Sequence, residues 1–133
     1  MNTQDTLPSL TLPPISRLTL ALYCGASGDH NPIHVDLDFA RAAGLDDVFA
    51  HGMLSMAYLG RLVVQWRPQR AVISLSARFT ATVAVGDVLT CRGHIADRTE
   101  SGGRPILRIA LAAVRQSGDT VLEGEATVWA DVT

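Results

Sequence analysis

The sequence predicts an α+β domain in which an antiparallel sheet wraps around one buried helix. Between residues 52 and 66 the only polar side chains are Ser55, Arg61 and Gln65, so apolar groups surround nearly the whole circumference of a helix there. After residue 72 the apolar period changes from 3.6 to 2, which is typical of strands that bury one face. When the sheet packs against the helix, the apolar surface of the helix and the apolar face of each strand are buried against one another.

Two shorter helices are expected before the buried helix. Residues 1–14 hold three prolines and are predicted to be loosely ordered or to form an edge strand. Ser16 is a suitable N-cap for a helix over 17–26, and Asp36 is a suitable N-cap for a helix over 37–43. Glycines follow both segments, as is common at helix ends.

Four strands are expected in the second half of the chain. Their predicted ranges are 73–83, 88–97, 106–115 and 120–130. The segments between them carry the turn sequences Val85-Gly86-Asp87, Ser101-Gly102-Gly103 and Ser117-Gly118-Asp119, which suit antiparallel hairpins. We therefore expect a four-stranded antiparallel meander.

Composition narrows the class of protein. The chain has 133 residues, the length of one domain, and its 47% hydrophobic residues argue against disorder. The net charge of −2 gives no basic field for nucleic acid or an anionic membrane, and all eleven cationic side chains are arginine, which excludes lysine chemistry. We expect neither a leader nor a membrane span, because the first residues lack a positive start and no apolar run is long enough. Two cysteines are too few for a disulfide framework. We expect a soluble, cytoplasmic, single-domain protein.

The polar residues that could take part in catalysis are concentrated in the loop predicted between the two short helices. Asp29 and His34 lie five residues apart, in a segment that Gly28 and Pro32 prevent from forming a regular element. A carboxylate and an imidazole that converge on one water form an acid–base pair, which can take a proton from one site and deliver it to another. This spacing leaves open which of the two is the base.

Gly52 marks the expected start of the buried helix and follows His51. The first backbone N–H groups of a helix lack partners inside it, and the positive end of the helix dipole lies behind them. The Gly52 N–H is therefore a candidate donor to an oxyanion, and with the acid–base pair it would suffice for enolate chemistry beside a carbonyl.

The chain resembles a known family in these same segments. Residues 23–36, with the core Ser-Gly-Asp-His-Asn-Pro-Ile-His-Val-Asp, closely resemble the hydratase motif of MaoC-like dehydratases and (R)-specific enoyl-CoA hydratases. Residues 50–53 match the start of the family's central helix, and residues 78–80 and 86–87 are also similar to its pattern. The length and the Ala-His-Gly-Met-Leu-Ser-Met segment look closest to the short (3R)-hydroxyacyl-acyl-carrier-protein dehydratase subunits of type II fatty-acid or polyketide synthesis.

The resemblance implies a hotdog fold, which is a curved antiparallel sheet wrapped around one long buried helix. It implies that Asp29 and His34 are the catalytic dyad, that the Gly52 N–H binds the thioester oxygen, and that Asn31 supports the loop or the dyad. The implied reaction is hydration of trans-2-enoyl thioesters or dehydration of (3R)-3-hydroxyacyl thioesters, on CoA or acyl carrier protein. No cofactor is implied, because CoA or phosphopantetheine is part of the substrate, and the implied partner is an identical or a related hotdog subunit.

Three other interpretations agree less well with these residues. A metal site at His30, His34 and His51 is disfavoured, because Pro32 prevents a helical ligand face and neither a cysteine nor a third carboxylate completes the set. A hotdog acyl-CoA thioesterase would use the same fold, but the Asp/His motif disfavours it. A non-catalytic acyl-binding subunit of a heteromeric dehydratase would usually lack the dyad, which is present here.

Overall fold

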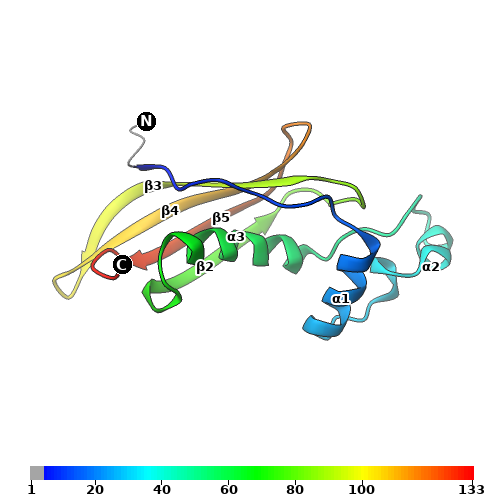
Figure 1. The fold of residues 1–133 in the computed structure, drawn as a ribbon, viewed down its shortest axis with the longest axis horizontal. Coiled ribbons are helices and arrows are strands. Elements are labelled where there is room, and N and C mark those ends of the chain that lie inside the picture. Colours follow the sequence, from blue (N-terminus) through cyan, green and yellow to red (C-terminus); the bar gives the residue numbers. More distant parts are fainter. Residues whose placement is uncertain (1–4) are drawn as a thin grey trace.

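The computed structural model describes residues 5–133, and its strands form a single antiparallel sheet (Figure 1). The strands are β1 (Leu10–Thr11), β2 (Val72–Phe79), β3 (Leu89–Ser101), β4 (Arg104–Arg115) and β5 (Thr120–Trp129). Their order across the sheet is β1-β3-β4-β5-β2. The α-helices are α1 (Arg17–Ser27), α2 (Leu37–Ala42) and α3 (Gly52–Trp66), and the short 3₁₀ turns are η2 (Pro32–His34) and η3 (Gln69–Ala71).

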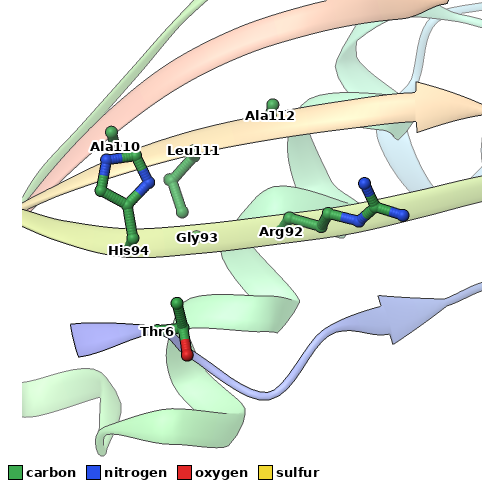
Figure 2. Close-up of a pocket in the computed structure, with 7 residues that line it drawn as sticks. All are labelled: Thr6, Arg92, Gly93, His94, Ala110, Leu111 and Ala112. Atoms are coloured by element: carbon green, nitrogen blue, oxygen red, sulfur yellow. The ribbon is translucent and has the colours of Figure 1, made fainter. Parts of the chain in front are cut away.

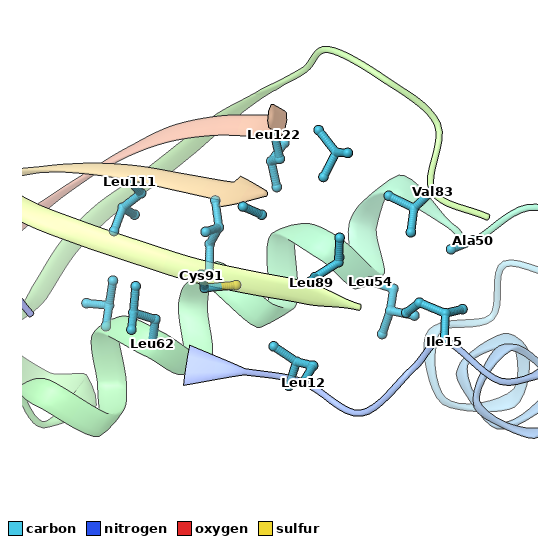
Figure 3. Close-up of a cluster of buried hydrophobic side chains, with 14 of the residues drawn as sticks. Leu12, Ile15, Ala50, Leu54, Leu62, Val83, Leu89, Cys91, Leu111 and Leu122 are labelled. Carbon is cyan, nitrogen blue, oxygen red and sulfur yellow. The ribbon is translucent and has the colours of Figure 1, made fainter. Parts of the chain in front are cut away.

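The long helix α3 packs against one face of the sheet, and the core lies between the two (Figures 1 and 3). Leu59 and Leu62 of α3 are fully buried there. Leu89, Ile109 and Leu122 meet them from three different strands. The helices α1 and α2 lie beyond the N-terminal end of α3, so the loop that joins them is held close to the start of α3 (Figure 1).

Both predicted N-caps are confirmed. The Ser16 hydroxyl accepts a hydrogen bond from the backbone N–H of Thr19 at 3.0 Å, and the Asp36 carboxylate accepts one from Phe39 at 3.1 Å. Gly28 ends α1 with a φ of +77°, a left-handed conformation that glycine adopts without strain. The loop between α1 and α2 therefore begins and ends at positions that local residues determine, Gly28 at the end of α1 and Asp36 at the start of α2.

The predicted meander is wrong at its first turn. Strand β2 pairs with β5 rather than with β3, so the two strands lie apart in the sheet. The segment 80–88 crosses between them, and its turn at Gly86 and Asp87 bonds to Ile15 rather than closing a hairpin. On the way, the Val83 carbonyl accepts a hydrogen bond from Ala50 at 2.8 Å, which brings this segment to the start of α3.

Two further expectations differ in detail. Strand β2 ends at Phe79 instead of 83, and a bulge near its start breaks the predicted alternation. The predicted alternation from residue 73 would place Ile73 and Phe79 on the buried face, but they are 43% and 49% exposed. Helix α3 is not buried all round either, because Met53 and Val64 face outward. The sheet covers only one side of α3 in a single chain.

The N-terminal segment runs along the edge of the sheet. Leu10 and Thr11 pair with Cys91 and Thr90 of β3, and residues 1–4 of the predicted lead-in lie outside the described part of the chain. No helix within residues 5–133 has the length and apolar character needed to cross a membrane.

Candidate active site

The loop between α1 and α2 is folded by its own side chains. The Ser27 hydroxyl accepts a hydrogen bond from the Asp29 N–H at 3.1 Å, and the Asp29 carboxylate accepts one from the Asn31 N–H at 3.2 Å. The Asn31 side chain in turn accepts a bond from the N–H of Ile33 and caps the 3₁₀ turn that carries His34. Asn31 therefore orients the segment that places His34.

The structure brings the side chains of Asp29 and His34 together. His34 is buried, and its Nδ1 lies 2.7 Å from the carbonyl oxygen of Phe49. A carbonyl only accepts hydrogen bonds, so Nδ1 carries the proton and the neutral ring presents a lone pair at Nε2. That Nε2 lies 4.0 Å from Oδ2 of the exposed Asp29. The gap is too long for a direct hydrogen bond, but one water can bridge it with two bonds of about 2.8 Å that meet at roughly 90°.

His51 joins this pair, which the sequence did not predict. It is 1% exposed, and its ring stacks on that of His34 with 3.9 Å between the centroids. Its Nε2 lies 3.3 Å from the carbonyl oxygen of Asp29 and 3.4 Å from Sγ of Cys24. Because the carbonyl must accept, Nε2 is the donor and fixes the backbone of Asp29.

Burial lowers the pKa of His51, and repulsion from the neighbouring His34 ring when that ring carries a proton on both nitrogens lowers it further. The hydrogen bond to the Asp29 carbonyl opposes this shift without reversing it. His51 is therefore neutral near pH 7. Its Nδ1 is buried and has no hydrogen-bond partner within the described part of the chain.

Gly52, the predicted oxyanion donor, is the first residue of α3 and follows His51 directly. The His51 side chain does not cap the helix, so it does not occupy the N–H of Gly52. A Cβ on Gly52 would lie 2.9 Å from Cε1 of Phe79, so the aromatic ring sits against the bare Cα. Gly52 and Phe79 both line a cavity of about 200 Å³, which Phe49 and Ser55 also line.

The ligand atoms of Asp29, His34 and His51 all lie within 4.8 Å of one another, the composition of a small metal site. The His51 Nε2 is engaged as a donor to the Asp29 carbonyl, however, so this nitrogen offers no lone pair to an ion, and the lone pair of the neutral ring is on the buried Nδ1. Zinc sites use three or four protein ligands. The cluster suits proton transfer better than metal binding, and His30, which the sequence suggested as a ligand, is exposed and outside it.

Figure 2 shows a different cavity, of about 260 Å³, between Thr6 and the strands β3 and β4. Arg92 and His94 line it together with small apolar residues of β4. None of the motif residues reaches it. The chemistry-bearing side chains are instead gathered at the N-terminal end of α3.

Comparisons with known proteins show which family this chain is similar to. The family model described as "MaoC like domain" matches residues 4–110. The (R)-specific enoyl-CoA hydratase of Rhodospirillum rubrum is 33% identical over 116 residues, which is 86% of this chain and 78% of that protein. The mitochondrial 3-hydroxyacyl-[acyl-carrier-protein] dehydratase FERN of Solanum lycopersicum is 26% identical over 79% of this chain, which spans only 64% of that relative.

The fold agrees with these sequence matches. The unliganded R-hydratase PhaJ1 from Pseudomonas aeruginosa superposes with a TM-score of 0.82 and 27% identity, over 96% of this chain and 82% of that one. The antiparallel sheet with one long helix against it is the hotdog fold, so the fold prediction is confirmed.

Proposed function

Because the chain belongs to the MaoC-like domain family, we propose that it is a hydro-lyase. It adds water to trans-2-enoyl thioesters and, in reverse, dehydrates (3R)-3-hydroxyacyl thioesters. The observation that carries this proposal is the 4.0 Å gap between Asp29 Oδ2 and His34 Nε2, which accommodates one water. The related hydratase and dehydratase named above catalyse these two directions.

The proposed chemistry needs one exchangeable proton on the dyad. In hydration, the oxygen of the bridging water bonds to C3 of the substrate while one residue accepts a proton from that water. The other residue delivers a proton to C2, so the dyad keeps one proton throughout. Two starting states meet this requirement: an Asp29 carboxylate with a doubly protonated His34 ring, or a protonated Asp29 carboxyl with a neutral His34 ring. The lone pair that neutral His34 presents at Nε2 makes it a competent acceptor.

The thioester must also be activated, because C2 becomes basic only as negative charge develops on the carbonyl oxygen. The N–H of Gly52, at the positive end of α3, is the proposed donor to that oxygen. A single donor of this kind contributes roughly 2.7–4 kcal/mol in a dry site. The cavity beside Gly52 has mainly apolar walls and suits the hydrocarbon part of an acyl thioester.

The decisive experiment follows the loss of enoyl absorbance of crotonyl-CoA with the purified protein. Asp29→Asn keeps an oxygen that can accept from Asn31, and His34→Asn keeps a donor for the Phe49 carbonyl. Each variant should fold normally and lose about 10²–10⁴-fold in kcat. His30→Ala, an exposed neighbour in the same loop, is the matched control and should retain activity. Full activity in both dyad variants would overturn the proposal.

The same assay separates the alternatives. A thioesterase would release free CoA from a saturated acyl-CoA, which a thiol reagent detects, whereas a hydratase would not. An acyl-binding subunit would be inactive alone and active only with a catalytic partner. A panel of enoyl-CoA and enoyl-carrier-protein substrates from about four to sixteen carbons then assigns the thioester carrier and the chain length.

We also propose that a second hotdog subunit, identical or related, covers part of this surface. Leu18 and Leu22 of α1 are more than 60% exposed. Met53 of α3 and Phe79, which lines the cavity beside Gly52, are about half exposed. Neither Asp29 nor His34 is among the residues that line this cavity, so the single chain does not enclose the dyad and Gly52 in one pocket. Sedimentation equilibrium should show a dimer, and a fully active monomer would contradict this proposal.

A further inference from the structure

Ser55 is a buried polar residue that the proposed chemistry has not yet used. It is the fourth residue of α3 and is 3% exposed. It lines the same cavity of about 200 Å³ as Gly52 and Phe79. Its hydroxyl oxygen has no hydrogen-bond partner among residues 5–133.

An unsatisfied hydroxyl in this position is costly. Burying such a group without a partner costs about 1–3 kcal/mol. A serine inside a helix usually avoids this cost by donating to the carbonyl four residues earlier, which here belongs to His51. That bond is absent among residues 5–133, although the His51 carbonyl does accept a hydrogen bond from the backbone N–H of Leu54 at 3.1 Å. A hydrogen-bond partner for the Ser55 hydroxyl would therefore have to be a molecule bound in the cavity.

Helix geometry places Ser55 and Gly52 on one face. Residues three apart are neighbours on a helix surface, and their Cα atoms are separated by about 4.5 Å along the axis. Side chains in a helix also lean toward its N-terminus, which brings the Ser55 hydroxyl back over the turn that begins with Gly52. The Phe79 ring, packed against the Gly52 Cα, shields this face from water. A small acceptor beside the helix start can meet both donors.

We propose that the Ser55 hydroxyl is a second hydrogen-bond donor to the thioester carbonyl oxygen, beside the N–H of Gly52. This inference rests on the proposed function and adds a catalytic residue to it. Ser55 forms no covalent bond in the reaction. It donates a hydrogen bond that strengthens as charge develops on the oxygen. The ligand also supplies the acceptor that the buried hydroxyl lacks in the free protein.

The kinetic test compares Ser55→Ala with Ser55→Thr, using crotonyl-CoA as substrate. Removal of one such donor typically lowers kcat by about 10²–10³-fold, and we expect a loss in this range for the alanine variant. Threonine keeps the hydroxyl and should recover most of the rate. Ser76→Ala, at an exposed position on β2, is the matched control and should behave like the wild type. A wild-type kcat in folded Ser55→Ala would overturn the inference.

A spectroscopic measurement tests the contact without turnover. A conjugated dienoyl-CoA absorbs at longer wavelength when its carbonyl is polarised, and the Asp29→Asn background prevents its conversion. Bound to this variant, the probe should show a red shift that becomes smaller when Ser55→Ala is added. An unchanged shift would overturn the inference even if the alanine variant were slow.

These results separate the two proposals. A wild-type chain that binds the probe but does not hydrate crotonyl-CoA refutes the proposed function, while the shift comparison still decides the role of Ser55. Activity that depends on Asp29 and His34 but not on Ser55 refutes only the second donor.

Discussion

Replacing Gly52 by alanine tests whether the bare start of α3 serves binding or packing. A Cβ at this position would lie 2.9 Å from Cε1 and 3.1 Å from Cδ1 of Phe79, whereas ordinary contacts begin near 3.4 Å. The ring must therefore withdraw by about 0.5 Å or more. Phe79 is 49% exposed, so it has room to do so.

The expected effects on stability and on activity differ in size. Alanine is more favourable than glycine in a helix by up to about 1 kcal/mol. This gain offsets the small cost of moving a half-exposed ring, so the free energy of unfolding should change by less than about 1 kcal/mol. Activity is more sensitive, since a displacement of about 1 Å at a reacting group can cost 10²-fold in rate. We therefore expect Gly52→Ala to fold normally and to lose about 10²-fold in kcat/KM for crotonyl-CoA.

The measurement combines thermal unfolding with steady-state kinetics. Gly60→Ala is the matched control on the same helix, because its Cβ would come no closer than 3.4 Å to Leu75. The double variant Gly52→Ala/Phe79→Ala removes the clash and shows how much of the loss is due to the displaced ring. Wild-type kinetics in Gly52→Ala would refute the reasoning, and so would a large loss of stability with normal activity at low temperature.

Three further predictions concern other residues of the core and of the site, and they can be tested without a substrate. Burial holds the pKa of His51 below its usual 6.5, so the unfolded chain takes up this proton at higher pH than the folded one. The free energy of unfolding should therefore fall as the pH drops below about 6.5, by at most about 1.4 kcal/mol per pH unit from this group. His51→Gln should flatten that dependence in urea titrations between about pH 5 and 8, and an unchanged slope would contradict the assignment. Gly124→Ala would place a Cβ 2.9 Å from the backbone oxygen of Ser76, and thermal unfolding should show a loss of about 1–3 kcal/mol that Gly60→Ala does not share. Burial raises the pKa of Cys91 to about 11, so mass spectrometry should find it unlabelled by iodoacetamide in the folded protein and labelled in urea.

Local signals in the sequence were sufficient for the helices. Ser16 and Asp36 cap the helices that follow them through bonds to residues three positions along the chain. The bounds of α3 agree with the apolar segment from 52 to 66, because Pro68 ends it and Gly52 begins it. Each of these features is decided within a few residues, so each could be predicted without knowledge of the fold.

Strand pairing could not be predicted in the same way. The turn sequence at 85–87 resembles a hairpin turn, yet its backbone bonds to Ile15, a partner distant in sequence. The segment 80–88 thereby joins strands that lie apart in the sheet. Turn chemistry specifies the local backbone conformation, whereas the choice of neighbouring strand depends on how the whole sheet covers α3.

In the candidate site, too, local features could be predicted and contacts between distant segments could not. The spacing of Asp29 and His34 indicated an acid–base pair, and a loop with its own hydrogen bonds explains why this spacing is informative. The stacking of His51 on His34 and the unsatisfied Ser55 hydroxyl depend on contacts between separate segments. The position of His51 directly before Gly52 was visible in the sequence, but its bond to the Asp29 carbonyl was not.

The N-terminal end of α3 connects the proposed catalytic groups to the core. His51 at this end holds the backbone of Asp29, and Ala50 just before it is bonded to Val83 of the crossing segment. Leu59, two turns further along α3, is fully buried against the sheet. A shift of the helix would therefore move the proposed oxyanion donors and the Asp29 loop together. A site held by a packed element in this way keeps its geometry as long as the core does, so core substitutions that displace α3 should lower activity before they unfold the protein.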